Sequence, residues 1–253
     1  MRGGLLKVVA FGDIHIGNVM ADLISFSHAM DEVIRYKPDI IVLLGDVIDG
    51  AMKYPTQIFK QSSIRPIDVQ RKLFRWLVLD KIKNADIKSK LVIIMGNHDT
   101  NFIENFLKPA LQGYDLEYEY VTKAVIGRTL FLHYILRRGR GSYATSITPM
   151  MVTMMLSQAL ALGVKRIVFS HIHRGLAHLI VGGVEMIALP SFMRFNDSYD
   201  YMYVPCYAII DDNAVTFRCI EDRPTISDVQ LYNIDIIDKA IKEIIKEEGK
   251  LYV

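Results

Sequence analysis

The chain has 253 residues, of which 51% are hydrophobic and 23% are charged. This length and apolar content are enough for a sizeable hydrophobic core, and they exclude a disordered chain. The 30 basic and 28 acidic residues leave a net charge of +2, which excludes an evenly basic nucleic-acid coat but leaves room for a local basic patch.

Five short apolar runs, rich in β-branched residues, predict buried strands. They cover residues 6–11, 40–44, 91–95, 129–132 and 166–169. Between the first two runs, residues 21–36 have the pattern of an amphipathic helix, and Pro38 follows its end as a stop signal. The order strand, helix, strand indicates a βαβ unit.

Further along the chain, apolar periodicity predicts two more helices, a hairpin and a terminal helix. They cover residues 66–84, 148–162, 176–189 and 234–248, in that order. The segment 148–162 is rich in methionine, and we expect it to fill the core or to form a subunit contact. Residues 174–253 are expected to complete the second of two sheets and to end in the terminal helix.

The two cysteines, Cys206 and Cys219, fall in a further predicted hairpin with strands at 204–210 and 215–220. A turn of either two or four residues centred on Asp212-Asn213 would place Cys206 opposite Cys219. The sequence leaves two outcomes open, a cross-strand disulfide or two small buried hydrophobic side chains, because intracellular disulfides are rare outside hyperthermophiles.

Polar side chains follow each of the five predicted strands at its carboxyl end. They are Asp13 and His15, Asp46 and Asp49, Asn97 to Asp99, His133, and His171 with His173. Because ligands bind at the carboxyl edge of strands in α/β folds, we expect these side chains to meet. Oxygen and imidazole ligands without thiolate suit Mn, Fe, Zn, Ni or Mg ions. The sequence therefore predicts a site for two divalent metal ions.

The motifs Asp13-x-His15, Gly45-Asp46-x-x-Asp49, Gly96-Asn97-His98-Asp99, a lone His133 and His171-x-His173, in this order, resemble those of the calcineurin-like metallophosphoesterase family. The resemblance spans residues 11–173. It implies an α/β fold in which two mixed sheets pack face to face as a sandwich with flanking helices, four layers in all, and a single domain over residues 1–253. It also implies hydrolysis of a phosphoester through attack of metal-activated hydroxide on phosphorus.

The resemblance assigns a role to each residue of the motifs. One metal ion would be held by Asp13, His15, Asp46 and His173, and the other by Asp46, Asn97, His133 and His171. Mn²⁺ is the favoured ion. His98 is expected to protonate the leaving oxygen or to orient the phosphate, with Asp99 fixing its ring. Asp49 is expected to support the ligands from behind.

The last motif departs from the family in one position, because Ser170 stands where the family usually has Gly. The change adds only a hydroxymethyl group, so we expect the ligands on either side to be retained.

Two basic segments lie near the predicted site. Residues 51–65 mix aromatic and basic groups, which suits base stacking and phosphate contact, or equally a solvated loop packed by its own Tyr and Phe. The residues Arg137, Arg138 and Arg140 follow His133, where they would bind a substrate phosphate or form a solvated face.

Within the family, Asp13-x-His15 and Asn97-His98-Asp99 most resemble the nuclease and phosphodiesterase branch, including the nuclease subunit of double-strand-break repair complexes. We therefore expect a phosphodiesterase or a nuclease of DNA or RNA, whose partner is a phosphoester substrate with nucleic acid as one candidate. The alternatives are a phosphomonoesterase of nucleotides or phosphoproteins and, less favoured because all ligands are present, a non-catalytic metal-binding scaffold. The short apolar stretches predict a cytoplasmic protein without membrane contact, and homo-oligomerisation is left open.

Overall fold

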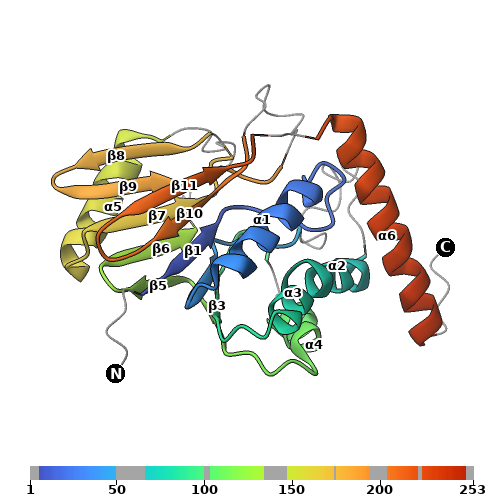
Figure 1. The fold of residues 1–253 in the computed structure, drawn as a ribbon. Helices are drawn as coiled ribbons and strands as arrows, with labels where there is room; N and C mark the ends of the chain where they lie inside the picture. The colour runs from blue at the N-terminus through green and yellow to red at the C-terminus, as the bar shows by residue number, and fades with distance from the viewer. Residues whose placement is uncertain are drawn as a thin grey trace.

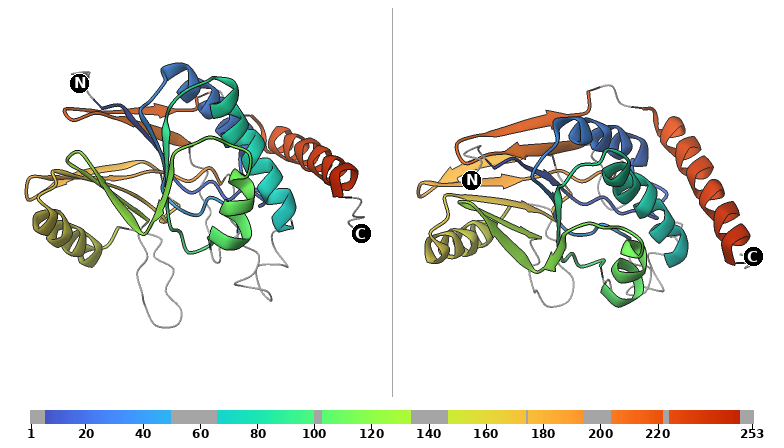
Figure 2. Two further views of the ribbon diagram at one scale, coloured as in Figure 1. Left: turned by 90° about the horizontal axis from the view of Figure 1, so that it is seen from below. Right: turned by 60° about the horizontal axis from the view of Figure 1, so that its bottom comes forward.

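Two mixed β-sheets lie face to face in the computed structural model (Figure 1). The structure describes residues 6–49, 66–99, 103–133, 147–173, 175–193, 204–221 and 224–248. Helices cover the outer side of each sheet, and Figure 2 shows the sheets as separate layers. The predicted α/β sandwich with flanking helices is confirmed.

The six-stranded sheet has the order β11-β10-β1-β2-β3-β4. Its strands are β1 (Val8–Phe11), β2 (Ile40–Leu43), β3 (Lys90–Ile94), β4 (Tyr118–Val121), β10 (Cys206–Ile210) and β11 (Val215–Cys219). Strands β1 to β4 run parallel, whereas β10 is antiparallel to β1 and to β11. The first three of these strands match predicted runs.

The five-stranded sheet has the order β5-β6-β7-β9-β8. Its strands are β5 (Lys123–Ile126), β6 (Thr129–His133), β7 (Arg166–Ser170), β8 (Ala177–Val181) and β9 (Val184–Ala188). Strands β6, β7 and β9 are parallel, and β5 and β8 close the two edges in the antiparallel direction. The predicted hairpin at 176–189 is therefore confirmed as β8 and β9.

The helices lie outside the two sheets. They are α1 (Leu23–Tyr36), α2 (Ile67–Phe74), the π-helical segment η2 (Arg75–Leu79), α3 (Asp80–Asn84), the π-helical segment η3 (Ile103–Leu107), α4 (Lys108–Leu111), α5 (Pro149–Leu162) and α6 (Ile226–Glu248). Helix α5 packs on the five-stranded sheet, and α1, α2 and α6 contribute to the core outside the six-stranded sheet. In the described part of the chain, none of these helices combines the length and apolar character needed to cross a bilayer.

The alternation of side chains along β1 explains why its sequence is apolar throughout. Val8 and Ala10 point into the core between the sheets, while Val9 and Phe11 point into the core beneath the helices. A strand that is buried on both faces shows a continuous apolar run rather than alternation. Both cores thus hold β1 in place, and the loop after Phe11 is anchored at its start.

Residues beyond the last predicted metal ligand contribute to both sheets. Strands β8 and β9 join the five-stranded sheet, as expected, but the hairpin of β10 and β11 lies at the edge of the six-stranded one. Its loop has four residues, Cys206 pairs with Cys219 across the strands, and a disulfide joins the two. Of the two outcomes that the sequence left open for the cysteines, the structure shows the disulfide.

Candidate metal centre

The ends of five strands bring the predicted ligands together. The motifs with Asp13, Asp46 and Asn97 follow β1, β2 and β3 of the six-stranded sheet, whereas His133 ends β6 and His171 follows β7 of the five-stranded sheet. The cluster therefore lies where the carboxyl ends of the two sheets meet. This position differs from the single sheet edge at which ligands bind in open α/β folds.

The first group of side chains consists of Asp13, His15, Asp46 and His173, with one ligand atom of each lying within 4.8 Å of the others. The Nε2 atoms of His15 and His173 are 3.0 Å apart. Nε2 of His173 lies 3.8 Å from Oδ1 of Asp13, and Nε2 of His15 lies 3.9 Å from Oδ2 of Asp46. The structure thus gathers the four residues that were assigned to one metal ion.

The second group contains Asp46, His133 and His171, again with ligand atoms within 4.8 Å of one another. Nε2 of His133 lies 3.0 Å from Nδ1 of His171 and 3.4 Å from Oδ2 of Asp46. The side-chain oxygen of Asn97 joins this group at 3.0 Å from the same Nε2 atom. Asp46 belongs to both groups, as a carboxylate that bridges two cations would.

The hydrogen bonds of the buried carboxylates indicate whether this cluster fits metal ions. Oδ2 of Asp13 accepts a hydrogen bond from the backbone N–H of His171, and Oδ1 of Asp46 accepts one from the backbone N–H of His98. The other oxygens, Oδ1 of Asp13 and Oδ2 of Asp46, are buried and accept no hydrogen bond from the described residues. Buried charges are normally paired or bind metals, so both oxygens fit a ligand role.

The spacing of the ring nitrogens gives a second test. Two ring nitrogens that each lie about 2.1 Å from one cation, with an angle of 90° between the two bonds, are about 3.0 Å apart. The pair His15 and His173 and the pair His133 and His171 both show 3.0 Å. Together with the donor set of imidazole, carboxylate and amide oxygen, this spacing fits divalent cations.

Glycine is required where two of the loops touch. A Cβ atom on Gly96 would lie 2.0 Å from the backbone nitrogen of Asp46, and one on Gly45 would lie 2.7 Å from Nδ1 of His133. Any larger residue would push these ligands apart. The two glycines next to Asp46 and Asn97 therefore permit the close approach of the loops.

Backbone strain is concentrated at the cluster. Six described residues other than glycine adopt positive φ angles, and four of them belong to the cluster. These are His15, Asp46, His171 and His173, with φ angles of 54°, 46°, 100° and 44°, whereas Lys37 and Asp86 lie elsewhere. Such conformations cost roughly 1–3 kcal/mol each and persist where the surrounding structure fixes them, often at functional sites. The strain supports a functional reading of the loops.

The carboxylate of Asp49 contacts two histidines of the cluster on the side away from the ligand atoms of His15. Its Oδ1 lies 2.9 Å from Nδ1 of His15 and 3.4 Å from Nδ1 of His98. Its Oδ2 accepts a hydrogen bond of 2.9 Å from the side chain of Asn18. Asn18 was not identified from the sequence, where a lone Asn three residues after His15 carries no distinctive signal.

The role expected for Asp99 requires a correction. One of its oxygens accepts hydrogen bonds from the backbone N–H groups of Val47 and Ile48, and the other accepts one from Gly96. Asp99 therefore ties the loop after β2 to the loop after β3, and Asp49 is the carboxylate beside the ring of His98. Burial and the charge of Asp46 raise the pKa of Asp99 to about 7.

Burial and nearby charges move the pKa values of the histidines in opposite directions. Burial alone would lower the pKa of His98, but the hydrogen bond to Asp49 and the charge of Asp46 raise it to about 10. Burial and the charge of His133 lower the pKa of His171 to about 4. In the metal-free protein His98 thus carries a proton at neutral pH. His171 is neutral, so one of its ring nitrogens can bind a cation.

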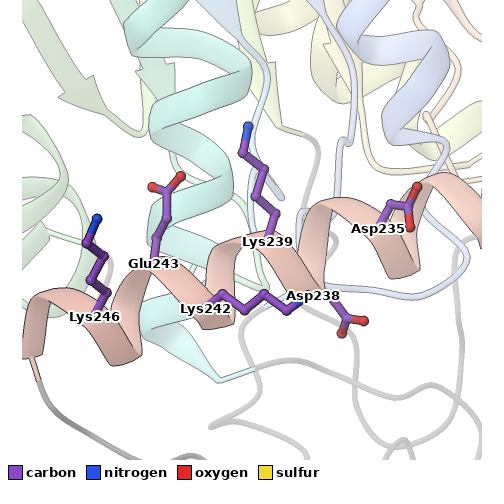
Figure 3. Close-up of a pocket in the computed structure, with 6 residues that line it drawn as sticks. All are labelled: Asp235, Asp238, Lys239, Lys242, Glu243 and Lys246. Carbon is purple, nitrogen blue, oxygen red and sulfur yellow. The ribbon is translucent and has the colours of Figure 1, made fainter.

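The predicted substrate-binding residues Arg137, Arg138 and Arg140 lie outside the described residues, as does the segment 51–65. A shallow pocket of about 350 Å³ on α6 shares no residue with the cluster (Figure 3). It is lined by Asp235, Asp238, Lys239, Lys242, Glu243 and Lys246. Glu243 also pairs with Lys72 of α2 at 3.0 Å, so the lining residues take part in helix contacts.

Solved structures share remote similarity with the chain. A metallophosphoesterase from Sphaerobacter thermophilus is 16% identical, with a TM-score of 0.47, over 94% of this chain and 98% of that chain. Vacuolar Protein Sorting 29 from Cryptosporidium parvum is 15% identical, with a TM-score of 0.48, over 86% and 93%. A predicted phosphoesterase from Streptococcus pneumoniae is 11% identical, with a TM-score of 0.43, over 86% and 90%.

No curated protein sequence matches the chain. The sequence model of the family described as calcineurin-like phosphoesterase, in contrast, matches residues 6–175, which is more than half of the chain. This segment contains every residue of the two groups described above. The chain belongs to the calcineurin-like phosphoesterase family.

Proposed function

We propose that the protein is a phosphodiesterase that depends on two divalent metal ions, with Mn²⁺ as the favoured ion and nucleic acid as the candidate substrate. The observation that carries the proposal is the position of Asp46. Its Oδ2 atom, which accepts no hydrogen bond from the described residues, lies 3.9 Å from Nε2 of His15 and 3.4 Å from Nε2 of His133, between the two ligand groups.

The residues of the two groups would hold one cation each and share Asp46. Bound there, two divalent cations would neutralise phosphate charge and lower the pKa of water, as two-metal sites in phosphoesterases do. The buried carboxylates Asp13 and Asp46 form the floor, whereas His98, His171 and His173 are partly exposed. A phosphate would approach from the histidine side.

The protonated ring of His98 supplies the proton donor of the proposed reaction. Nδ1 lies beside the carboxylate and the backbone oxygen of Asp49, and we assign Nε2 to the side of the substrate. Cleavage of the ester bond places negative charge on the leaving oxygen, and proton transfer from His98 neutralises it there. Before the reaction, the charge of Asp49 stabilises the protonated ring of His98.

The choice of a diester over a monoester rests on the motifs Asp13-x-His15 and Asn97-His98-Asp99, which resemble the phosphodiesterase and nuclease branch. A non-catalytic scaffold is less favoured, because the assigned ligands and His98 meet in one cluster.

The test compares turnover of an aryl phosphodiester with turnover of the matching monoester, using metal-stripped protein resupplied with Mn²⁺. His98→Ala removes the proton donor, and His28→Ala, an exposed histidine on α1, is the matched control. We expect faster diester turnover that is lost in His98→Ala and kept in His28→Ala. Preferred cleavage of the monoester would overturn the diesterase proposal in favour of a phosphomonoesterase, and an unchanged His98→Ala variant would favour the scaffold.

A further inference from the structure

Ser170 occupies the position at which this chain departs from the usual motif of the family. It ends β7 and is completely buried. Its hydroxyl group donates a hydrogen bond of 2.7 Å to the backbone carbonyl of Leu44, and its oxygen lies 3.1 Å from Nδ1 of His133. Leu44 immediately follows β2 and His133 ends β6, so three strand ends from two sheets meet around one carbonyl.

The same carbonyl determines which nitrogen of His133 carries hydrogen. A carbonyl oxygen only accepts hydrogen bonds, and that of Leu44 lies 2.8 Å from Nδ1. Nδ1 must therefore be the protonated nitrogen. Nε2 then faces the ligand group, 3.0 Å from the side-chain oxygen of Asn97 and 3.4 Å from Oδ2 of Asp46. In the neutral ring the proton therefore lies on Nδ1, and this is the form that binds a cation through Nε2.

We propose that Ser170 is a positioning residue for the second metal ion and that it acts through His133. The inference rests on the proposed function, because it requires that this ion binds. The hydroxyl group holds the Leu44 carbonyl from a second direction and places a second polar atom beside Nδ1. A ligand ring that is fixed in this way loses less freedom when it binds a cation, so the affinity for the ion is higher.

The chain offers a matched control for the loss of a buried hydroxyl group. Ser89 is also buried, and it donates a hydrogen bond of 2.5 Å to the backbone carbonyl of Pro38. It directly precedes β3, at the end of the strand opposite to Asn97. Ser89→Ala therefore removes the same kind of bond away from the cluster, and it measures the general cost of this change.

The experiment is a calorimetric titration of metal-stripped protein with Mn²⁺, applied to the wild type, Ser170→Ala, Ser170→Gly and Ser89→Ala. The binding step that disappears in His133→Ala identifies the second ion. We expect both substitutions of Ser170 to weaken that step about tenfold, which is the lower end for residues that support a ligand, and to leave the first step unchanged. Ser89→Ala should leave both steps unchanged. Ser170→Gly restores the usual residue of the family and so guards against a folding defect of the alanine variant.

A spectroscopic measurement separates positioning from general loosening. In protein loaded with Zn²⁺, which is diamagnetic, the Nδ1 proton of His133 should exchange with solvent faster in Ser170→Ala than in the wild type. An unchanged second binding step in both Ser170 variants, or an equal weakening of both steps, would overturn the inference. A wild type that binds no second ion would instead overturn the proposed function and this inference with it, and that result is visible before any variant is compared.

Discussion

Asp49 holds the ring of His98 from the side of Nδ1, with its carboxylate oxygen at 3.4 Å and its backbone oxygen at 3.2 Å. The same carboxylate oxygen lies 2.9 Å from Nδ1 of His15. Burial alone would raise the pKa of Asp49, but the hydrogen bonds to His15 and His98 lower it to about 2. One carboxylate that is charged at neutral pH thus lies beside both a proposed metal ligand and the proposed proton donor.

The first prediction follows from this shared carboxylate. Asp49→Asn removes the charge that favours a protonated His98, so proton donation to the leaving group should weaken. We expect turnover to fall about 100-fold for an alkyl ester, whose leaving oxygen needs a proton, and clearly less for a nitrophenyl ester, whose leaving group is stable as an anion. The measurement is kcat/KM for the two esters with saturating Mn²⁺.

His98→Ala serves as the reference for this experiment, because it should show the same dependence on the leaving group. If Asp49→Asn reduced turnover of both esters equally, the carboxylate would act through the metal ligand His15 and not through His98. That outcome would contradict the assigned role.

The buried strands and the residues that gather in the cluster could be predicted from the sequence because both leave local signals. The run from Val8 to Phe11 is apolar on both faces, since both faces of β1 are buried. Strands β4 and β5 were missed. Each has only four residues, lies at a sheet edge and exposes side chains such as Tyr118, so neither shows an apolar run.

Other features depend on tertiary contacts that no local pattern reveals. Helix α6 begins at Ile226 and not at residue 234, because Thr225 and Asp228 cap its start reciprocally. The first turns lack a regular apolar pattern, since Leu231 and Ile234 are exposed. The partner of His98 was also misassigned. Asp99 is adjacent in sequence, but only the folded loops show that its oxygens bind backbone N–H groups.

Metal removal should lower the stability of the protein. Oδ1 of Asp13 and Oδ2 of Asp46 are buried without a hydrogen bond among the described residues, and bound cations would compensate their charge. A ligand at 100 times its Kd stabilises the folded state by about 2.7 kcal/mol. Thermal unfolding of stripped protein with and without Mn²⁺ measures this effect. Asp46→Asn should show a much smaller increase in Tm, and a wild type whose Tm is insensitive to Mn²⁺ would argue against the metal centre.

Reduction of the disulfide should destabilise the fold. Cys206 and Cys219 are separated by 13 positions in the sequence and join β10 to β11 at the sheet edge. A crosslink that closes a loop of this size contributes about 3 kcal/mol by restricting the unfolded chain. Urea unfolding of the wild type with and without a reductant should show this loss, and a double variant with both cysteines changed to alanine should not respond to the reductant. An equal response of both proteins would assign the effect to something other than this bond.

The arginines after His133 give a prediction for the proposed nucleic-acid substrate. Changing Arg137, Arg138 and Arg140 together to alanine should weaken binding of single-stranded DNA and make it less dependent on salt, by about 0.7 in the logarithmic slope for each phosphate that an arginine no longer neutralises. The control removes the same charge elsewhere, with Lys239, Lys242 and Lys246 of α6 changed to alanine. A fluorescence anisotropy titration at several salt concentrations measures both slopes. If both triple variants lost affinity equally, the effect would come from net charge alone, and the arginines would have no specific role.

The hydrogen bond from Tyr207 to Glu32, 2.7 Å long, should make stability depend on pH in the alkaline range. Burial and this bond raise the pKa of Tyr207 above its ordinary value. A group whose pKa is raised by folding stabilises the protein fully below its unfolded pKa of about 10 and loses this contribution as pH rises further. Tyr207→Phe should therefore be less stable than the wild type by about 1 kcal/mol at neutral pH. Above about pH 10 the difference should shrink by up to about 1.4 kcal/mol per pH unit, because only the wild type carries this phenol. Urea midpoints of both proteins across this range measure the difference, and a gap that stays constant or widens would contradict the assignment.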